Sequence, residues 1–281
     1  MTAPSRISIN QVGLLAIPAV GYLLIVYVFP LAWLLAHSLT ARSGDFTLDA
    51  YVRFLADPFN WRVIGNTLRI AGLVTIVCLV VGYPVALALA RARGLAQIAL
   101  LTAIILPLSI GVVVKAFAWQ IVLRRDGVVS QALMALGIWD EPQRLLFTET
   151  GLVLGAANVF LPFMVLPIYS VVKLIDPRLS EAAATLGATP GYRYVRVSLP
   201  LTLPGIVTGV AFVFSLSVSM FVIPTLLIGD RFQTLATMTG RAFLLMRDEQ
   251  LGSTTAVVLL ALAVAVVVVS AWLARRLGSN A

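Results

Sequence analysis

One stretch of this sequence, EAAATLGATPGYRYVRVSLP at residues 181–200, holds polar and charged side chains that could perform chemistry. It holds one carboxylate, Glu181, and two guanidinium groups, Arg193 and Arg196, between two long apolar runs. Such groups form charge-assisted contacts with a partner surface or with lipid headgroups. The only histidine, His37, has no cysteine, histidine or carboxylate close to it in the sequence and is interpreted as an ordinary interfacial residue. These residue types indicate recognition rather than catalysis.

No other grouping in the sequence predicts a catalytic or cofactor site. No nucleophile stands with a base, no metal-ligand spacing occurs, and no G-x-x-x-x-G-K-[ST] motif could hold a nucleotide. The prediction is therefore a non-enzymatic chain without a cofactor or metal of its own. A membrane-embedded enzyme or assembly factor is disfavoured on the same grounds.

A second, weaker set of polar residues lies within apolar segments. Lys115 either extends its ammonium group outward to the interface or faces a water-filled cavity. Ser215, Ser217 and Ser219 recur at every second position, so they cannot share one helical face. Some of these serines would line a translocation path near Met220, while others bond to their own backbone. The candidate path residues are Lys115, Ser217, Ser219 and Met220.

The elements that must position these residues are membrane helices. Hydrophobic residues make up 60% of the chain and charged residues only 11%, and the mean hydropathy is +1.00. A soluble domain of 281 residues could not bury so much apolar surface. The fold class predicted is all-α, with one transmembrane domain over residues 1–281. The net charge of +8 is attributed to the cytoplasmic ends of spans rather than to nucleic-acid binding.

Six apolar stretches are long enough to cross a bilayer as helices. They are 12–38, 67–90, 98–123, 152–172, 205–228 and 254–273. The first is about twice the length of a signal-peptide core and is interpreted as a retained span. Kinks are expected at Pro107 and Pro224, and Arg69 is expected to extend toward the interface. The glycines of G-x-x-x-G at 205–209 are interpreted as helix-packing positions.

The loops give an orientation. The N-terminus, the 91–97 turn, the 173–203 loop and the C-terminal tail carry 9 basic residues and only 2 acids. The three alternate loops, which are longer in total, carry 9 basic residues and the other 10 of the 12 acids. The positive-inside rule therefore predicts that both termini and the 173–203 loop are cytoplasmic. No carboxylate falls within a predicted span, which weakens the alternative of a stand-alone secondary carrier or channel.

The 173–203 loop contains start and stop signals for a short helix. Asp176 offers an N-cap acceptor before Pro177, whose missing N–H costs nothing at the first helical position. The helix is predicted to run to Leu186, with Gly187 in the left-handed conformation that ends it.

A second start signal follows at Thr189–Pro190, and this helix is predicted to run to about Leu199, where Pro200 stops it. The small side chains of Ala182, Ala183 and Ala188 would let another surface approach closely. Two interpretations fit this pattern equally. The pair lies on lipid headgroups, or it fits into a groove of another protein.

The spacing within the loop resembles the EAA loop of inner-membrane permease subunits of binding-protein-dependent ABC importers. The matching residues are Glu181-Ala182-Ala183, Gly187 and Val197-Ser198-Leu199-Pro200, with Val197 in place of the usual isoleucine. Further stretches, including LPLSIGVVVKAFAWQIVL and SLPLTLPGIVTGVAFVFSLSVSMFVIPTLLIG, resemble the spermidine/putrescine-type branch. Together they cover most of residues 60–270.

The resemblance implies a type I ABC importer permease fold with six transmembrane helices in a bacterial inner membrane. It implies that the loop docks on a cytoplasmic ATPase dimer, which holds the ATP and Mg²⁺ and drives alternating access. The docking residues implied are Glu181, Ala182, Ala183, Gly187, Ala188, Arg193, Leu199 and Pro200. Glu181 would pair with the ATPase or hold its own loop. Further partners implied are a second permease subunit, preferably a different chain, and a periplasmic or lipid-anchored solute-binding protein.

The substrate prediction stays divided. Permeases of this branch often have an acid where SMFVIP has Met220, and that acid is missing here. Lys115 would also repel a polyamine that passes close by. The solute is therefore predicted to be a polyamine, or an anionic or zwitterionic molecule such as a phosphonate or an opine.

Overall fold

The computed structural model describes residues 17–18, 20–40, 46–229 and 232–278, and nearly all of its regular structure is helical. The residues 12–16 and 19 of the first predicted span lie outside this description. The helices, with 3₁₀ and π segments labelled η, are η1 Leu24–Val28, α2 Phe29–Ser38, α3 Asp49–Ala56, α4 Pro58–Arg91, α5 Gly94–Ile105, η2 Leu106–Ser109, α6 Val112–Val122, α7 Val128–Ala135, α8 Glu149–Leu174, α9 Pro177–Thr185, α10 Pro190–Arg193, η3 Tyr194–Ser198, α11 Leu199–Ser219, α12 Val222–Leu227, α13 Leu235–Arg241, η5 Ala242–Met246 and α14 Glu249–Gly278.

Within the described ranges, five helical segments are long and apolar enough to cross a membrane. They are Val20–Ser38, Pro58–Arg91, Glu149–Leu174, Pro190–Ser219 and Glu249–Ser270. Each contains most of a predicted span. The helices extend beyond the apolar runs because capping groups and loop contacts lie further out, as where the Asp57 carboxylate accepts the Phe59 N–H at the start of α4.

The third predicted span, 98–123, is not one tilted helix. The structure breaks it into Gly94–Ser109 and Val112–Val122, which meet at an angle of 105°. Pro107 has no N–H to continue the helical ladder, and the chain tightens into η2 before Ile110 becomes extended. The kink predicted at Pro107 is confirmed. The bend is sharp enough to divide this predicted span into two helices.

The fifth predicted span, 205–228, is also divided. Helix α11 ends at Ser219, Met220 is extended with ψ 128°, and the short α12 follows. Pro224 explains the position of this break, because in a continuous helix its missing N–H would have bonded to the carbonyl of Met220. The distortion caused by Pro224 therefore appears four residues before the proline itself.

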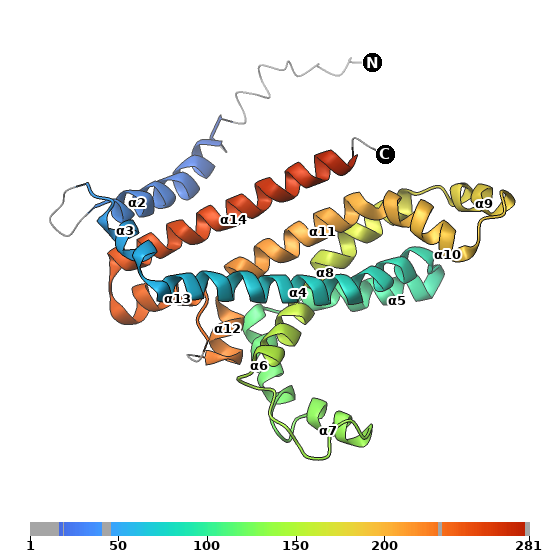
Figure 1. Cartoon of the computed structure of the whole chain (residues 1–281), viewed down its shortest axis with the longest axis horizontal. Helices are drawn as coiled ribbons and strands as arrows, with labels where there is room; N and C mark the ends of the chain where they lie inside the picture. Colours follow the sequence, from blue (N-terminus) through green and yellow to red (C-terminus); the bar gives the residue numbers. More distant parts are fainter. Residues whose placement is uncertain (1–16, 19, 41–45, 230–231, 279–281) are drawn as a thin grey trace, which may run out of the picture.

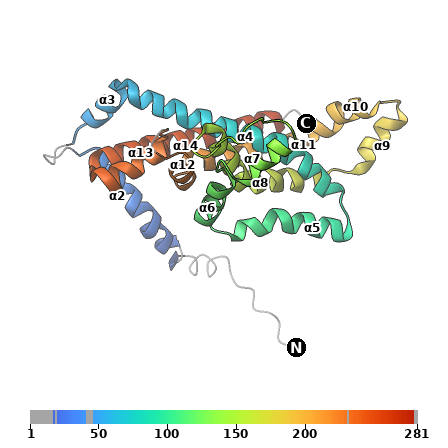
Figure 2. The same cartoon turned by 90° about the horizontal axis from the view of Figure 1, so that it is seen from below.

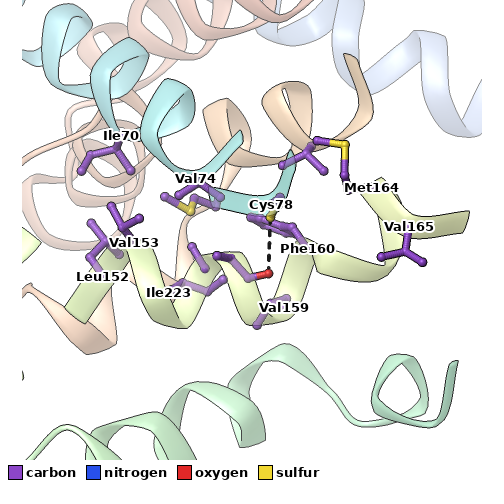
Figure 3. Close-up of a cluster of buried hydrophobic side chains, with 14 of the residues drawn as sticks. Ile70, Val74, Cys78, Leu152, Val153, Val159, Phe160, Met164, Val165 and Ile223 are labelled. Atoms are coloured by element: carbon purple, nitrogen blue, oxygen red, sulfur yellow. Dashed lines mark hydrogen bonds between the residues drawn. The ribbon is translucent and has the colours of Figure 1, made fainter. Parts of the chain in front are cut away.

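The core of the molecule lies where α4, α8 and α11 pack together (Figure 1). Figure 3 shows this cluster between α4 and α8, with Cys78 of α4 facing α8. The thiol of Cys78 is fully buried and lies 3.5 Å from the carbonyl oxygen of Ala157, which agrees with its interpretation as a small buried hydrophobic residue. Gly205 and Gly209 lie against α8 so closely that a Cβ would come within 3.0 Å of Ile168 Cα or 2.8 Å of Met164 Sδ. Their predicted role in close helix packing is confirmed.

The connecting segments lie at separate ends of this bundle. Helices α9 and α10 extend past one end, toward which the C-terminal part of α14 also points (Figures 1 and 2). Helices α3 and α13 lie at the opposite end, and α7 projects from the side of α6 (Figure 1). The 91–97 turn and the 173–203 loop are thus separated in space from the segments 46–63, 124–150 and 232–253 (Figure 1).

Candidate functional site

The first helix of the projecting loop forms as its capping signals predict. The Asp176 carboxylate accepts the backbone N–H of Arg178 at 2.9 Å and so caps α9. At the other end, Ala188 N–H bonds to the Ala183 carbonyl at 3.1 Å, and Gly187 has a φ of +83°. Only glycine adopts this left-handed conformation without strain, so α9 turns sharply into the next helix.

The second helix also starts as predicted, but it does not stop at Pro200. Thr189 caps α10 by accepting the Tyr192 N–H, and the chain then continues through η3 directly into α11. The missing N–H of Pro200 would have bonded to the carbonyl of Arg196. The π-helical turn η3, in which Leu199 N–H bonds to the Tyr194 carbonyl, accommodates this loss without ending the helix. The predicted stop is wrong, and α10 extends a helix that is long and apolar enough to cross a membrane.

A shallow cavity of about 410 Å³ lies in the angle between α9 and α10. It is lined by Ala183, Leu186, Gly187, Ala188, Thr189 and Tyr192. Leu186 is 87% exposed and Tyr192 is largely exposed, so the cavity presents apolar groups to its surroundings. An exposed apolar hollow flanked by small residues is typical of a surface that receives a partner. We call these six residues the α9–α10 hollow.

The structure brings together only some of the predicted docking residues. Ala183, Gly187 and Ala188 belong to the α9–α10 hollow, whereas Glu181 and Ala182 lie exposed on α9 outside it. Glu181 makes no ion pair with any residue in the described ranges. Its carboxylate is exposed on the surface of α9.

The remaining predicted docking residues lie further from the hollow. Arg193 ends α10 and is partly buried. Leu199 and Pro200 lie in the first turn of α11, where Leu199 packs against the central hydrophobic cluster. Leu199 thus joins the loop to the core instead of forming its outer surface.

A polar contact that the sequence did not indicate ties this loop to α4. The Tyr83 side chain is 9% exposed, and its Oη lies 3.2 Å from Thr202 Oγ1. The Tyr83 ring also meets that of Tyr194 edge to face, with centroids 6.2 Å apart. The signal was present as a tyrosine within an apolar run, because a buried tyrosine hydroxyl requires a partner.

A neighbouring contact joins α5 to the C-terminal end of α8. Gln97 donates a hydrogen bond to the hydroxyl of Tyr169 at 3.0 Å, and Lys173 places its ammonium 5.6 Å from the centre of the same ring. The end of the bundle next to α9 is thus held by tyrosine side chains from several helices.

The candidate path residues do not form one site in the isolated chain. Lys115 is half-buried on α6, whereas Ser217, Ser219 and Met220 lie at the end of α11. Ser217 is 3% exposed, and its hydroxyl has no hydrogen-bond partner among the described residues. Ser219 is exposed and bonds to its own backbone at Ser215, which is the alternative role predicted for part of this series.

Two residues interpreted as isolated have charged neighbours. Arg69 donates to the Glu149 carboxylate at 2.9 Å, where the sequence predicted only an extension to the interface. His37 stacks on Trp33 and lies 3.8 Å from a carboxylate oxygen of Glu249. Both carboxylates begin helices far away in the sequence, so neither pairing could be read from local spacing. Within the described ranges, no group of three or more histidine, cysteine and acidic side chains could hold a metal ion.

Comparison with known proteins gives a consistent result. Residues 82–279 match the model of the family described as "Binding-protein-dependent transport system inner membrane component". The chain is similar to the spermidine/putrescine transport system permease protein PotB of Escherichia coli (strain K12), with 31% identity over 264 residues, which cover 92% of this chain and 95% of PotB.

Solved structures share the same fold. A chain of a bacterial ABC transporter that imports the acidic polysaccharide alginate superposes with a TM-score of 0.78 at 20% identity, covering 94% of this chain and 95% of the other. The same TM-score, at 19% identity and 94% coverage of both chains, is obtained for the alginate transporter in complex with a pentasaccharide-bound periplasmic protein.

Proposed function

The chain belongs to the family of inner membrane components of binding-protein-dependent transport systems, and on that premise we propose that its α9–α10 hollow is the surface on which a cytoplasmic ATPase subunit acts. The predictions of an all-α, multi-pass inner-membrane protein and of an ABC importer permease subunit without enzymatic activity are confirmed. The partner ATPase binds the ATP and Mg²⁺, and hydrolysis of that ATP supplies the energy for transport.

The observation that carries the proposal is the continuity of α10, η3 and α11. A partner that moves the α9–α10 hollow displaces a helix whose other end lies within the bundle. Because α11 packs on both α8 and α4, the displacement moves the core helices as a group. A flexible linker at Pro200 would have absorbed the same displacement.

The orientation and the other partners are also part of the proposal. The α9–α10 loop and both termini face the cytoplasm, where the excess of basic residues over acids is expected. The solute-binding protein approaches the other side of the membrane, and a second permease subunit, preferably a different chain, completes the pore. Two features support this arrangement: the loops separate by charge, and a transporter of the same fold is known in complex with a periplasmic protein.

The solute is proposed to be a small polar molecule, and two classes have specific support. Similarity to PotB favours a polyamine. Met220 at the α11 break and Lys115 on α6 favour an anionic or zwitterionic solute, because neither would stabilise a polycation. Calorimetric titration of the solute-binding protein with putrescine and with a phosphonate distinguishes these classes.

The docking proposal is tested by reconstituting the permease with its ATPase, binding protein and second permease subunit in proteoliposomes. Glu181→Ala removes the exposed carboxylate beside the hollow and should lower both ATPase association and transport. Glu141→Ala, which removes an exposed carboxylate from the segment between α7 and α8, is the matched control and should change neither. Full association and transport in Glu181→Ala together with Gly187→Pro would contradict the docking role of the loop.

A further inference from the structure

A second cleft lies between the end of α6 and the segment that precedes α8. It has a volume of about 860 Å³ and is lined by Gln120, Arg124, Arg125, Asp126, Pro142, Gln143, Arg144, Leu146 and Phe147. Three guanidinium groups thus face one carboxylate. We call this set the basic cleft.

The backbone around the basic cleft is held in place by hydrogen bonds. The N–H groups of Leu145 and Leu146 both bond to the Leu123 carbonyl, at 3.2 and 2.9 Å. Phe147 N–H bonds to the Leu227 carbonyl at 2.9 Å while Phe147 itself has a φ of +68°. A non-glycine residue in this conformation costs free energy and persists only where its surroundings enforce it. The cleft is therefore a built feature rather than a loose loop.

Two arginines of the basic cleft contact neutral groups of the protein. Arg125 Nε donates to the Pro142 carbonyl at 3.0 Å, and the Arg144 guanidinium lies 4.6 Å from the centre of the Phe147 ring. None of the three arginines forms an ion pair with a carboxylate of the described residues. Three arginines and one aspartate give the lining of the cleft a positive charge, which favours an anionic ligand.

Helix α6, which leads into the basic cleft, has an exposed apolar face. Val114, Phe117 and Ile121 are all exposed on α6, and intervals of three and four residues place them on one helical face. Arg124 continues the same spacing, one turn beyond Ile121, to whose carbonyl its N–H bonds. The opposite face of α6 is packed, with Ala116 and Leu123 each 1% exposed. An exposed apolar stripe therefore ends at the basic cleft.

We propose that the basic cleft binds the headgroup of an anionic phospholipid whose acyl chains lie along the exposed stripe of α6. A phosphodiester accepts bidentate hydrogen bonds from arginine, and the chains would cover an apolar surface that a free anion would leave exposed. An acidic protein surface would match the arginines but not the stripe. The lipid therefore fits both halves of the site.

The test uses the full-length chain purified in detergent, without partners, so the outcome does not depend on the proposed transport function. Native mass spectrometry measures binding of phosphatidylglycerol and of phosphatidylcholine with the same acyl chains. The double variant Arg124→Gln/Arg144→Gln should weaken phosphatidylglycerol binding on the order of thirtyfold, as expected for two arginines near a lipid anion. It should leave phosphatidylcholine binding unchanged.

Arg53→Gln/Arg62→Gln is the matched control, because Arg53 on α3 and Arg62 on α4 are exposed and removing both causes the same change of charge outside the cleft. It should retain full selectivity for phosphatidylglycerol. Equal losses in the control and the double variant would overturn the proposal, since they would indicate only a general attraction of lipid to a basic protein.

Two further arms separate the lipid from other anions. Ile121→Gln should weaken phosphatidylglycerol binding while the arginines remain. Inorganic phosphate in molar excess should not displace the lipid from the wild-type chain. Displacement by phosphate would show that the cleft takes a free anion. Unchanged lipid binding in Ile121→Gln would show that no acyl chain lies on the stripe of α6. Either result would overturn the assignment of a lipid.

Discussion

At the scale of single residues, Gly187 sets the angle between α9 and α10. Its φ of +83° is disfavoured for a residue with a Cβ, although no atom lies within 4 Å of the position that a Cβ would occupy. Substitution therefore acts on the backbone conformation and not through a steric clash. Substitutions of Gly187 can therefore test whether the shape of the α9–α10 hollow matters for ATPase binding.

Gly187→Ala is expected to cost about 1 to 2 kcal/mol in local backbone conformation, which favours a more open turn and weakens ATPase binding. Gly137→Ala provides the control, because Gly137 also has a positive φ of +68° and an open Cβ position but lies at the end of α7. ATPase association measured by co-purification should fall only for Gly187→Ala. A similar loss for both variants would indicate general instability.

Tyr83 is the residue that most directly connects the loop to the core. Thr202 donates its hydroxyl hydrogen to the Leu199 carbonyl at 2.8 Å, so the hydrogen between Tyr83 and Thr202 comes from Tyr83. Tyr83→Phe removes this donor and keeps the ring against Tyr194. The loss is expected to be about 1 kcal/mol of stability.

The functional effect of Tyr83→Phe is expected to be larger than the effect on stability. More ATP should be hydrolysed per solute molecule imported, because α11 is less firmly joined to α4. The measurement is the ratio of ATP turnover to transport in proteoliposomes, with Thr202→Val and the double variant completing a cycle. If the two single changes were fully additive in this ratio, the two side chains would not act together.

At the scale of elements, the continuous segment α10–η3–α11 is the central feature. Val195→Gly together with Val197→Gly should lower its local helix stability by about 1 kcal/mol, because glycine is a poor helix former. ATPase association should persist, since the α9–α10 hollow is unchanged, while transport should fall. Val267→Gly with Val269→Gly introduces the same change in α14, on exposed positions, and should leave transport intact. Equal transport by both pairs would show that continuity of this segment is not required.

Local signals predicted the starts of these elements better than their ends. Asp176 and Thr189 were identified as caps because a cap needs only a few neighbouring residues. The effect of a proline depends on its surroundings. Pro107 breaks the third predicted span. The break caused by Pro224 lies four residues earlier, at Met220, and Pro200 is accommodated in a π-helical turn without a break.

The parts of the site that sequence reasoning missed are contacts between distant segments. Tyr83 and Thr202 are separated by 119 positions, and Arg69 and Glu149 by 80. No periodicity or spacing relates such residues, because the packing of whole helices brings them together. The helices of the 173–203 loop were predictable because their capping residues lie within a short stretch of the sequence.

At the scale of the whole molecule, only some of the membrane helices pack tightly against one another. Helices α4, α8 and α11 bury each other's side chains, whereas α2 packs chiefly on α14 and leaves its apolar residues exposed. This distribution fits a subunit in which a rigid centre moves between lipid and further subunits. Its direction in the membrane decides which end the ATPase can reach.

The orientation can be tested with a thiol-reactive reagent that cannot cross the membrane. The chain has a single cysteine, Cys78, which is fully buried, so the wild-type protein should not react. Leu136→Cys, after α7, and Leu186→Cys, in the α9–α10 hollow, introduce thiols at positions that are 72% and 87% exposed. In spheroplasts that contain the permease subunits without the ATPase, Leu136→Cys should be labelled from outside, whereas Leu186→Cys should be labelled only after the membrane is permeabilised. Adding the ATPase to permeabilised membranes should then protect Leu186→Cys and leave Leu136→Cys reactive. Labelling of Leu186→Cys in intact spheroplasts would reverse the proposed orientation and place the α9–α10 hollow out of reach of ATP-driven motion.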